Sequence, residues 1–482
     1  MFNNILNKIK QNTDWKLVSV LILTFVVRVI DLNYNGPYID ESFHTAVLKF
    51  GNVFYITGEV YLWPVISYFV YKIGGIVAVR FVAAVFGTLT VGFVYKIAEI
   101  FSRKFNKDNN YVGFLAALVF SLSAPALFVS TLGGYDAMAF MLYALGFWQL
   151  AKGIEKNKSL PLFWGAFFLT LSAATRYMVF IYLPVAIIYA IYSRNSDNKK
   201  KILYYFLFPL TTLFTVYWLL NKDHVISSIW LALNSEIELL ANQSIIYVFK
   251  NLFISVWPII LLSTAGSLIY IVKAIKNKSL NQIINALFLL GSTFLVFIYH
   301  LYSGNDLAMN RNLTMAVMFG SIISGLVLNS LIIYLGKIKY FIIIIFVVIL
   351  FWQAKGVVAK YRDWPDWRPV TQAIRDLGLS DKTIWCTAYH GGLGNVWQLR
   401  AEFGSGVDID SPWYAPESSP YKPDSEGVLK VASKKKIPVV VGPLEGWKLE
   451  VGSSVDGYKI KKVIKLDNDM PTVYIFEIEN SS

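Results

Sequence analysis

The chain has 482 residues, of which 56% are hydrophobic and only 16% are charged. A soluble domain carries roughly a quarter charged residues, so this composition excludes an ordinary soluble protein over most of the length. The formal net charge of +13 does not indicate a nucleic-acid partner, because the basic residues stand in short clusters between long apolar runs. Many of these runs, from about Lys16 to Lys355, are near the ~20 residues that cross a bilayer, and they predict a polytopic α-helical membrane protein.

The basic clusters mark every second connection between apolar runs, which is the pattern of cytoplasmic loops. Placing the first cluster in the cytoplasm predicts a cytoplasmic amino terminus, about eleven spans and an extracytoplasmic carboxy-terminal domain. The first span is expected over 17–31 as a retained anchor, because no small-residue cleavage site follows it. A long outside segment, expected to contain surface helices, follows over 32–75. The ten further spans are predicted over about 77–99, 112–131, 136–151, 160–174, 177–192, 203–220, 252–272, 284–301, 313–334 and 339–355.

Most of the unusual polar residues fall in the connections that this path places outside. Asp136 and Arg176 lie in very short turns between apolar spans, where a charge is costly unless it has a partner or a task. Asp40 and Glu41 come directly after the first span. Two adjacent carboxylates repel each other, which favours a base role for one of them, although a solvated acidic pair can also simply open a surface helix. Together these residues indicate a site at the outer face.

Two further arginines stand inside predicted spans. Arg28 lies near the outer end of the first span, and Arg80 lies in the second. Both are expected to reach the membrane interface with a long side chain or to pair with a neighbour, which for Arg28 would be Asp31. These roles are structural, so neither arginine is a candidate site residue.

The apolar character ends near residue 360, so residues 1–360 are expected to form the membrane domain and 361–482 a soluble α/β domain. From Asp363 onward there are 17 acidic and 14 basic residues, which excludes a basic nucleic-acid module. A helix is predicted over 368–379, and strands over 383–387, 437–441, 458–466 and 472–478. The single cysteine, Cys386, falls in a strand and is not a nucleophile candidate. The glycine-rich run from His390 to Gly394 is expected to be a turn.

Several motifs together resemble a known family. The first outside segment has an acidic pair followed by a small residue and an aromatic, and an acidic residue precedes the fourth span. In this combination the sequence resembles the GT-C membrane glycosyltransferases, above all the protein O-mannosyltransferases and lipid A aminoarabinose transferases. The resemblance covers roughly the first 190 residues. The matching segments are Asp40 to Phe43, Tyr61 to Tyr68, Val79 to Gly87, Ser130 to Ala137 and Asn310 to Asn312.

The resemblance implies transfer of a sugar from a polyprenyl-phosphate carrier to an extracytoplasmic glycan, lipid or protein, usually with inversion. Asp40 would be the base, and Glu41 and Asp136 would orient the acceptor or that base, or hold a divalent cation. Arg176 and Arg311 are candidates for the carrier phosphate, since a guanidinium is always charged and grips two oxygens. Possible substrate-binding residues are His44, Tyr61, His300, Tyr302 and Asn305.

Two other functions remain open from the sequence. One is a transporter or flippase of lipid-linked saccharides, and the other is a ligase or polymerase that uses them. Transporters place ionisable groups near the bilayer midplane, often on repeats and broken helices, whereas here they gather at outer ends and no repeat is visible. The soluble domain would recognise the acceptor, cover the active site or only stabilise the last span.

Overall fold

The structure is a computed structural model of the whole chain. The chain forms two compact units: the first holds 1–32, 54–63 and 80–361, and the second holds 33–53, 64–79 and 362–482. The residues that the structure describes are 14–36, 41, 45, 62–105, 111–193, 198–220, 222, 244–304, 308–334, 338–362, 364, 366–386, 399, 402–403, 407–408, 425–443, 449–465 and 472–479.

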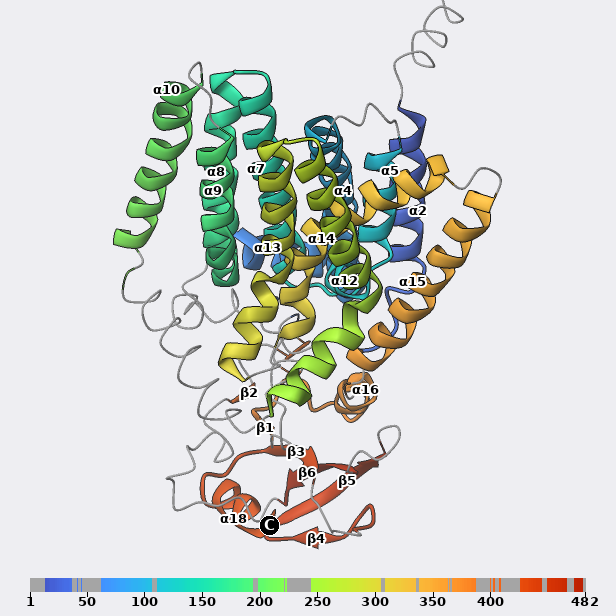
Figure 1. Cartoon of the computed structure of the whole chain (residues 1–482). Coiled ribbons are helices and arrows are strands. Elements are labelled where there is room, and N and C mark those ends of the chain that lie inside the picture. The colour runs from blue at the N-terminus through green and yellow to red at the C-terminus, as the bar shows by residue number, and fades with distance from the viewer. Residues whose placement is uncertain are drawn as a thin grey trace, which may run out of the picture. The chain divides into compact units, whose positions relative to one another are not determined.

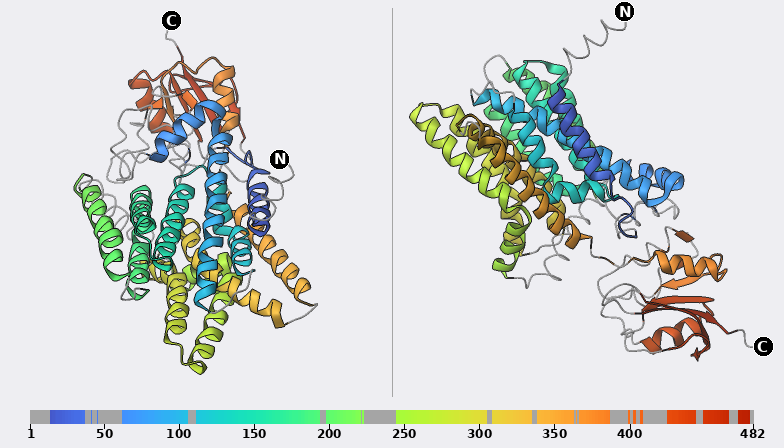
Figure 2. Two further views of the ribbon diagram at one scale, coloured as in Figure 1. Left: turned by 90° about the horizontal axis from the view of Figure 1, so that it is seen from above. Right: turned by 90° about the vertical axis from the view of Figure 1, so that its right-hand side faces the viewer.

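The first unit is a bundle of apolar helices that run alongside one another (Figures 1 and 2). Among the described residues, seven helices are long and apolar enough to cross a membrane, or eight if one bent pair counts as a single span. The prediction of a polytopic helical membrane protein is therefore confirmed, while the count of eleven spans stays a prediction. The helices are α2 (Trp15–Val29), α4 (Leu62–Lys104), α5 (Val112–Ser121), α6 (Ala124–Thr131), α7 (Asp136–Glu155), α8 (Ser159–Thr175), α9 (Leu183–Tyr192), α10 (Lys199–Ile202, helical onward to Leu220), α12 (Ile245–Lys276), α13 (Leu280–Ser303), α14 (Met309–Tyr334) and α15 (Lys339–Tyr361).

Two predicted segments are not single straight helices. The third span, predicted over 112–131, consists of α5 and α6, which meet at an angle of 64°. Pro125 stands in the first turn of α6, where its missing N–H costs nothing, whereas inside one continuous helix it would break the ladder. Helix α4 is kinked at Gly74 and Gly75, and the Gly75 φ of 62° is a conformation that favours glycine. The kink separates the part of α4 in the predicted outside segment from the part in the predicted second span.

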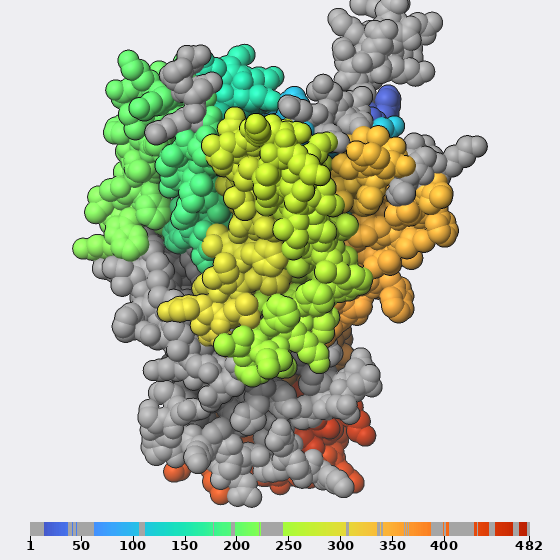
Figure 3. Space-filling view, in the orientation of Figure 1, coloured from blue at the N-terminus to red at the C-terminus, as the bar shows by residue number. Residues whose placement is uncertain are grey.

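Helix α14 is buried along most of its length and packs against α5, α12 and α13. The contact with α5 is close because Gly325 has no side chain: a Cβ there would lie 2.8 Å from the Val112 carbonyl oxygen. Helices α7 and α8 also meet backbone to backbone, where a Cβ on Gly146 would lie 3.1 Å from the Gly165 oxygen. The side chains of α12 and α13 form one continuous surface on the face seen in Figure 3. This packing fixes the ends of α7, α8, α13 and α14.

The carboxy-terminal domain contains a mixed six-stranded sheet in the order β2-β1-β3-β6-β5-β4. Strand β1 is parallel to β2 and β3, and the other pairs are antiparallel. The predicted α/β class, the helix and all four predicted strands are confirmed. The elements are α16 (Arg368–Asp376), β1 (Ile384–Cys386), β2 (Val407–Asp408), α18 (Ser425–Lys434), β3 (Val439–Pro443), β4 (Ser454–Val455), β5 (Tyr458–Ile464) and β6 (Val473–Ile478).

Alternate side chains of this sheet serve two separate cores. In β1, Ile384 and Cys386 pack with Ile374 of α16, whereas Trp385 packs with Leu429 of α18. The period of two places one helix on each face of the sheet, as Figure 2 shows. Burial also raises the pKa of the Cys386 thiol, so the thiol stays protonated and unreactive, as the sequence predicted.

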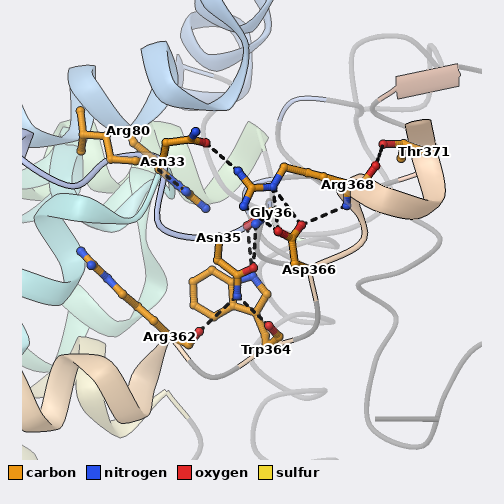
Figure 4. Close-up of polar contacts among 10 residues, drawn as sticks. Asn33, Asn35, Gly36, Arg80, Arg362, Trp364, Asp366, Arg368 and Thr371 are labelled. Carbon is orange, nitrogen blue, oxygen red and sulfur yellow. Dashed lines mark hydrogen bonds and ion pairs between the residues drawn. The ribbon is translucent and has the colours of Figure 1, made fainter. Parts of the chain in front are cut away.

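The second unit joins the start of the predicted outside segment to the chain that follows α15 (Figure 4). The Asn35 amide donates to the main-chain oxygens of Trp364, at 2.7 Å, and Arg362, at 3.3 Å. In return, Trp364 Nε1 donates to the Gly36 oxygen at 3.1 Å. The Arg362 guanidinium lies 3.6 Å from the centre of the Tyr34 ring, whose edge meets the Trp364 ring. We call Asn33 to Gly36 together with Arg362 to Arg368 the loop clasp.

Arg368 and Asp366 complete the loop clasp. Arg368 pairs with Asp366 at 2.6 Å, and its Nη1 donates to Asn33 Oδ1 at 2.7 Å. A Cβ on Gly36 would lie 2.6 Å from Asp366 Oδ1, so any larger residue at position 36 would displace this carboxylate. Farther along, the Tyr71 hydroxyl of α4 donates to Glu402 at 2.6 Å. Both ends of the predicted outside segment are thus bonded to the carboxy-terminal part of the same unit.

We expect Trp364→Phe to lower the free energy of unfolding by about 1 kcal/mol, because it removes the hydrogen bond to Gly36 but keeps an aromatic ring against Tyr34. Thermal or chemical denaturation of the purified protein measures the change. Trp352→Phe is the matched control, since the Trp352 side chain is 80% exposed on α15. Equal stability of the two variants would show that the hydrogen bond from Trp364 to Gly36 does not stabilise the fold.

Candidate active site

Asp136 is the first residue of α7, and its carboxylate is buried, with 1% of the side chain exposed. The amide groups at a helix amino terminus favour a negative charge, which lowers the cost of burying this carboxylate. The turn before it is only four residues long, from Leu132 to Tyr135, because α6 ends at Thr131. The apolar sequences on both sides therefore hold a charged group inside the packed bundle.

Arg176 follows the last residue of α8 and faces the start of α7. Its backbone is extended, with φ −151° and ψ 120°, so α8 ends here and a short 3-10 helix, Tyr177–Tyr182, follows. Arg176 Nη1 pairs with Asp136 Oδ1, and only 2% of the arginine side chain is exposed. The guanidinium also lies 5.7 Å and 5.3 Å from the ring centres of Tyr135 and Phe140. A bond of 2.6 Å from the Ser172 hydroxyl to the Ala139 oxygen ties the two helices together beside this pair.

Two further polar groups come from α13 and the first turn of α14. Asn312 Oδ1 accepts a hydrogen bond of 2.6 Å from Arg176 Nη2. The Asn312 Nδ2 lies 3.2 Å from His300 Nε2. With its oxygen facing Arg176, the Asn312 amide donates to His300, so the histidine accepts at Nε2 and carries its proton on Nδ1. His300 is 1% exposed, so this chain of bonds is buried.

Arg311 brings a second guanidinium to Asp136, with Nη1 at 3.5 Å from Oδ2. Its side chain is 15% exposed, so it is the most accessible charged group of the set. We call Asp136, Arg176, Arg311, Asn312 and His300 the arginine cluster. A carboxylate held between two guanidinium groups can fix both of them in place, and two fixed guanidinium groups can bind an anion that presents several oxygens.

The structure unites four of the residues selected from the sequence, although more than 120 positions separate Arg176 from His300. Tyr302 does not join them: its side chain is 92% exposed on another face of α13. Glu41 is buried in a helical turn of the second unit, and its main-chain oxygen accepts a bond of 3.0 Å from the Thr45 hydroxyl. Asp40, His44, Tyr61 and Asn305 lie outside the described residues.

Sequence reasoning missed the role of Asn312. It stood in the Asn-Arg-Asn motif that opens the tenth span, but only Arg311 was chosen from that motif. The available signal was an amide beside an arginine in the first turn of an apolar helix, where a buried amide needs hydrogen-bond partners. Tyr135 and Phe140 were also missed, because nothing in their spacing distinguishes them from ordinary core aromatics.

Three carboxylates were named from the sequence as able to hold a divalent cation: Asp40, Glu41 and Asp136. Of these, Asp136 has a guanidinium group at each of its two oxygens. Within the described ranges, no group of three or more His, Cys, Asp or Glu side chains is arranged to hold a metal ion. Asp136 in this arrangement therefore fits the role of orienting the two arginines better than the role of a metal ligand.

Comparison with known proteins agrees with the helical bundle. The family described as dolichyl-phosphate-mannose-protein mannosyltransferase matches residues 62–218. No curated protein matches the sequence. The solved structure of ArnT from Cupriavidus metallidurans bound to undecaprenyl phosphate is similar, with a TM-score of 0.58 and 12% identity over 97% of this chain and 99% of that one.

Two other glycosyltransferase structures are also similar. The oligosaccharyltransferase of Archaeoglobus fulgidus in the apo form has a TM-score of 0.56 and 11% identity, over 89% of this chain and 70% of that chain. The arabinofuranosyltransferase AftD from Mycobacteria has a TM-score of 0.51 and 11% identity, over 97% of this chain and 40% of that chain. The chain is thus a multi-pass membrane protein with the GT-C fold, as its sequence motifs predicted.

Proposed function

We propose that this protein is a membrane glycosyltransferase that moves a sugar from a polyprenyl-phosphate carrier to an extracytoplasmic glycan, lipid or protein. The observation that carries the proposal is the arginine cluster, which is held at the ends of four helices in a GT-C bundle. The mannosyltransferase family match and the undecaprenyl phosphate bound to ArnT support the class of donor.

The arginine cluster suits the phosphate of such a donor. Its five residues hold two guanidinium groups and one carboxylate, so their net charge is +1 when all three are ionised. A guanidinium has five N–H donors, so an arginine that pairs with Asp136 can bind phosphate oxygens at the same time. We assign Arg311, the more accessible of the two, to direct contact and Arg176 to the base of the phosphate site.

The reaction then follows from the charges. An acceptor hydroxyl attacks the anomeric carbon of the sugar while Asp40 takes the hydroxyl proton. The bond from that carbon to the phosphate oxygen breaks, and the carrier leaves as a polyprenyl phosphate monoester. Attack from the face opposite the leaving group inverts the configuration at the anomeric carbon. The arginines stabilise the charge that grows on the departing phosphate, and Asp136 holds them in place.

The proposal includes an orientation. The basic clusters support a cytoplasmic amino terminus, which puts the start of α7 and α14 and the carboxy-terminal domain at the outer face. Residues 1–360 would be the catalytic membrane domain, and 361–482 the extracytoplasmic domain that contacts the acceptor. Accessibility of single introduced cysteines to an impermeant reagent in intact cells tests this, with Cys386 first replaced by serine. If a cysteine at position 156 is labelled and one at position 456 is not, the amino terminus is extracytoplasmic and the proposed orientation is wrong.

A donor-turnover assay tests the activity and separates it from transport. The purified protein is reconstituted in liposomes with radiolabelled polyprenyl-phosphate mannose, glucose or a pentose, together with cell-envelope acceptors. We expect free polyprenyl phosphate to appear in step with labelled acceptor. A flippase would move the labelled lipid between leaflets with the sugar still attached, and a ligase would require an oligosaccharide donor. Either result would show that the proposed sugar transfer from a polyprenyl-phosphate monosaccharide is wrong.

In the same assay, we expect Arg311→Met to reduce kcat/KM for the donor by about 10²-fold, because one of the donors aimed at the phosphate is lost. The KM for the acceptor should change little. Arg103→Met is the matched control: Arg103 pairs with Glu155 at 2.6 Å, and its side chain is 50% exposed. Equal effects of the two substitutions would remove Arg311 from the phosphate site.

A further inference from the structure

His300 was selected from the sequence as a possible substrate-binding residue, but its position in the bundle suits a different role. The imidazole lies in the last turn of α13, and its side chain is 1% exposed. A ring with so little free surface is poorly placed to bind a sugar that enters from outside the bundle. Its Nε2 atom lies 3.2 Å from Asn312 Nδ2, in the first turn of α14. At this nitrogen, His300 thus meets another side chain of the arginine cluster.

The orientation of the Asn312 amide follows from its two partners. A guanidinium has only N–H donors, so the Asn312 atom that lies 2.6 Å from Arg176 Nη2 is the oxygen, and the amide nitrogen faces His300. Asn312 is 4% exposed, so little water is available to replace either partner. If the amide turned over, its N–H groups would face those of Arg176, and a buried donor would lose its acceptor. The unprotonated Nε2 of His300 therefore stabilises the orientation in which the oxygen meets Arg176.

The Asn312 oxygen gives Arg176 a second fixed point. Nη1 pairs with the Asp136 carboxylate and Nη2 donates to the Asn312 oxygen, so both terminal nitrogens are held. One contact alone would leave the plane of the guanidinium free to turn, whereas two contacts on the planar fork set its direction. The second acceptor is also neutral. With two guanidinium groups and one carboxylate ionised, the arginine cluster keeps a net charge of +1, which a second carboxylate at position 312 would cancel.

We propose that His300 and Asn312 are positioning residues for the Arg176 guanidinium. The imidazole holds the Asn312 amide, the amide oxygen holds Nη2, and the remaining N–H donors of Arg176 are thereby directed at the donor phosphate. This inference rests on the proposed function, in which Arg176 forms the base of the phosphate site. In this role neither residue touches the donor or the acceptor, so each acts only through Arg176. The role requires a hydrogen-bond acceptor at position 300 and does not require an imidazole.

Replacing His300 by leucine or by glutamine separates the effect of the acceptor from that of the ring. The full-length protein is reconstituted in liposomes with the radiolabelled polyprenyl-phosphate sugar that the wild type turns over. We expect His300→Leu to lower kcat/KM for the donor by about tenfold, because the Asn312 amide loses its acceptor. His300→Gln, whose side-chain oxygen can accept the same bond, should retain most of the activity. A higher KM for the acceptor in His300→Leu would place His300 at the acceptor and overturn the proposal.

A second comparison repeats His300→Leu in an Arg176→Lys background. Lysine keeps a charge beside Asp136 but lacks the planar fork that reaches Asn312 as well. Arg176→Lys should lower donor turnover by itself, and we expect His300→Leu to add no further loss, since its route through Arg176 is already broken. Asn312→Leu should behave like His300→Leu in both backgrounds, and it replaces that variant if His300→Leu does not fold. An equal tenfold loss in both backgrounds overturns the proposal.

Tyr192→Phe is the matched control for the loss of a hydrogen bond on α13. The Tyr192 hydroxyl donates to Asn285 Oδ1 at 3.0 Å, near the opposite end of that helix. Denaturation should show similar losses of stability in Tyr192→Phe and His300→Leu, whereas only His300→Leu should lower kcat/KM. A comparable loss of turnover in both variants would show a purely structural role for His300. If the wild type turns over no such donor, the proposed function fails. If it does and His300 is not coupled to Arg176, only the positioning role fails.

Discussion

Replacing Asp136 by asparagine is expected to lower the free energy of unfolding by about 3–5 kcal/mol, because it leaves the buried guanidinium of Arg176 without its carboxylate. Asparagine keeps the shape of the side chain, so the loss reports the charge and not the packing. Chemical denaturation in detergent, followed by the fluorescence of the tryptophans, measures it. Donor turnover should fall as well, since both arginines lose the group that orients them.

The double variant Asp136→Asn with Arg176→Met separates the two effects. Removing both charges should restore most of the lost stability, because an apolar replacement for a buried ion pair is often neutral. Turnover should stay lost, since the proposed phosphate site then lacks Arg176. The double-mutant cycle gives the coupling between the two residues directly. If the double variant is as unstable as the sum of the single ones, the two side chains do not form a functional pair.

Asp40→Asn is expected to lower kcat by about 10²–10⁴-fold, the range that a general base contributes. Asparagine cannot take the proton of the acceptor hydroxyl, but the donor phosphate is assigned to other residues, so donor affinity should be nearly unchanged. Equilibrium binding of labelled donor and single-turnover transfer measure the two quantities separately.

Glu41→Gln is the control for that substitution, because it removes the neighbouring charge and keeps Asp40. It should reduce turnover less than Asp40→Asn does. Full activity of Asp40→Asn would show that another group takes the proton. A larger loss of turnover in Glu41→Gln than in Asp40→Asn would indicate that Glu41 is the base and Asp40 the orienting group.

The sequence was sufficient to locate the apolar helices, because a membrane helix is identified by the length and apolar character of one continuous run of residues. It was also sufficient to gather Asp136, Arg176, Arg311 and His300 as candidates, since the alternation of basic loops assigns them to one side. It did not fix their pairing, because the contact of Arg176 with Asp136 depends on how α8 ends and how α13 and α14 pack. The bend between α5 and α6 was missed because a membrane helix can contain a proline when neighbouring groups satisfy the freed backbone oxygens, so Pro125 alone does not predict a break.

The carboxy-terminal sheet shows the same limit. Its strands were predicted correctly, since apolar and β-branched residues follow one another over short stretches there. The loop clasp was not predicted, because Asn33 to Gly36 and Arg362 to Arg368 are ordinary polar segments more than 320 positions apart. Contacts between such segments leave no periodic pattern in a single sequence. Arg28 was expected to reach the membrane interface, but its side chain is only 1% exposed. This burial was missed for the same reason, since a local pattern does not reveal which helices surround a residue.

The loop clasp also sets the boundaries for protein engineering. A chimera that takes the soluble domain of a relative by a single cut after α15 would join a foreign 362–482 to the native 33–53, and it would lose the bonds that Asn35 and Arg368 form. The unit that can be exchanged between relatives is therefore discontinuous in sequence. Residues 33–53 and 64–79 have to be exchanged together with 362–482. Relatives that exchanged this domain during evolution would be expected to have replaced both parts together, and positions 36 and 366 would then change as a pair.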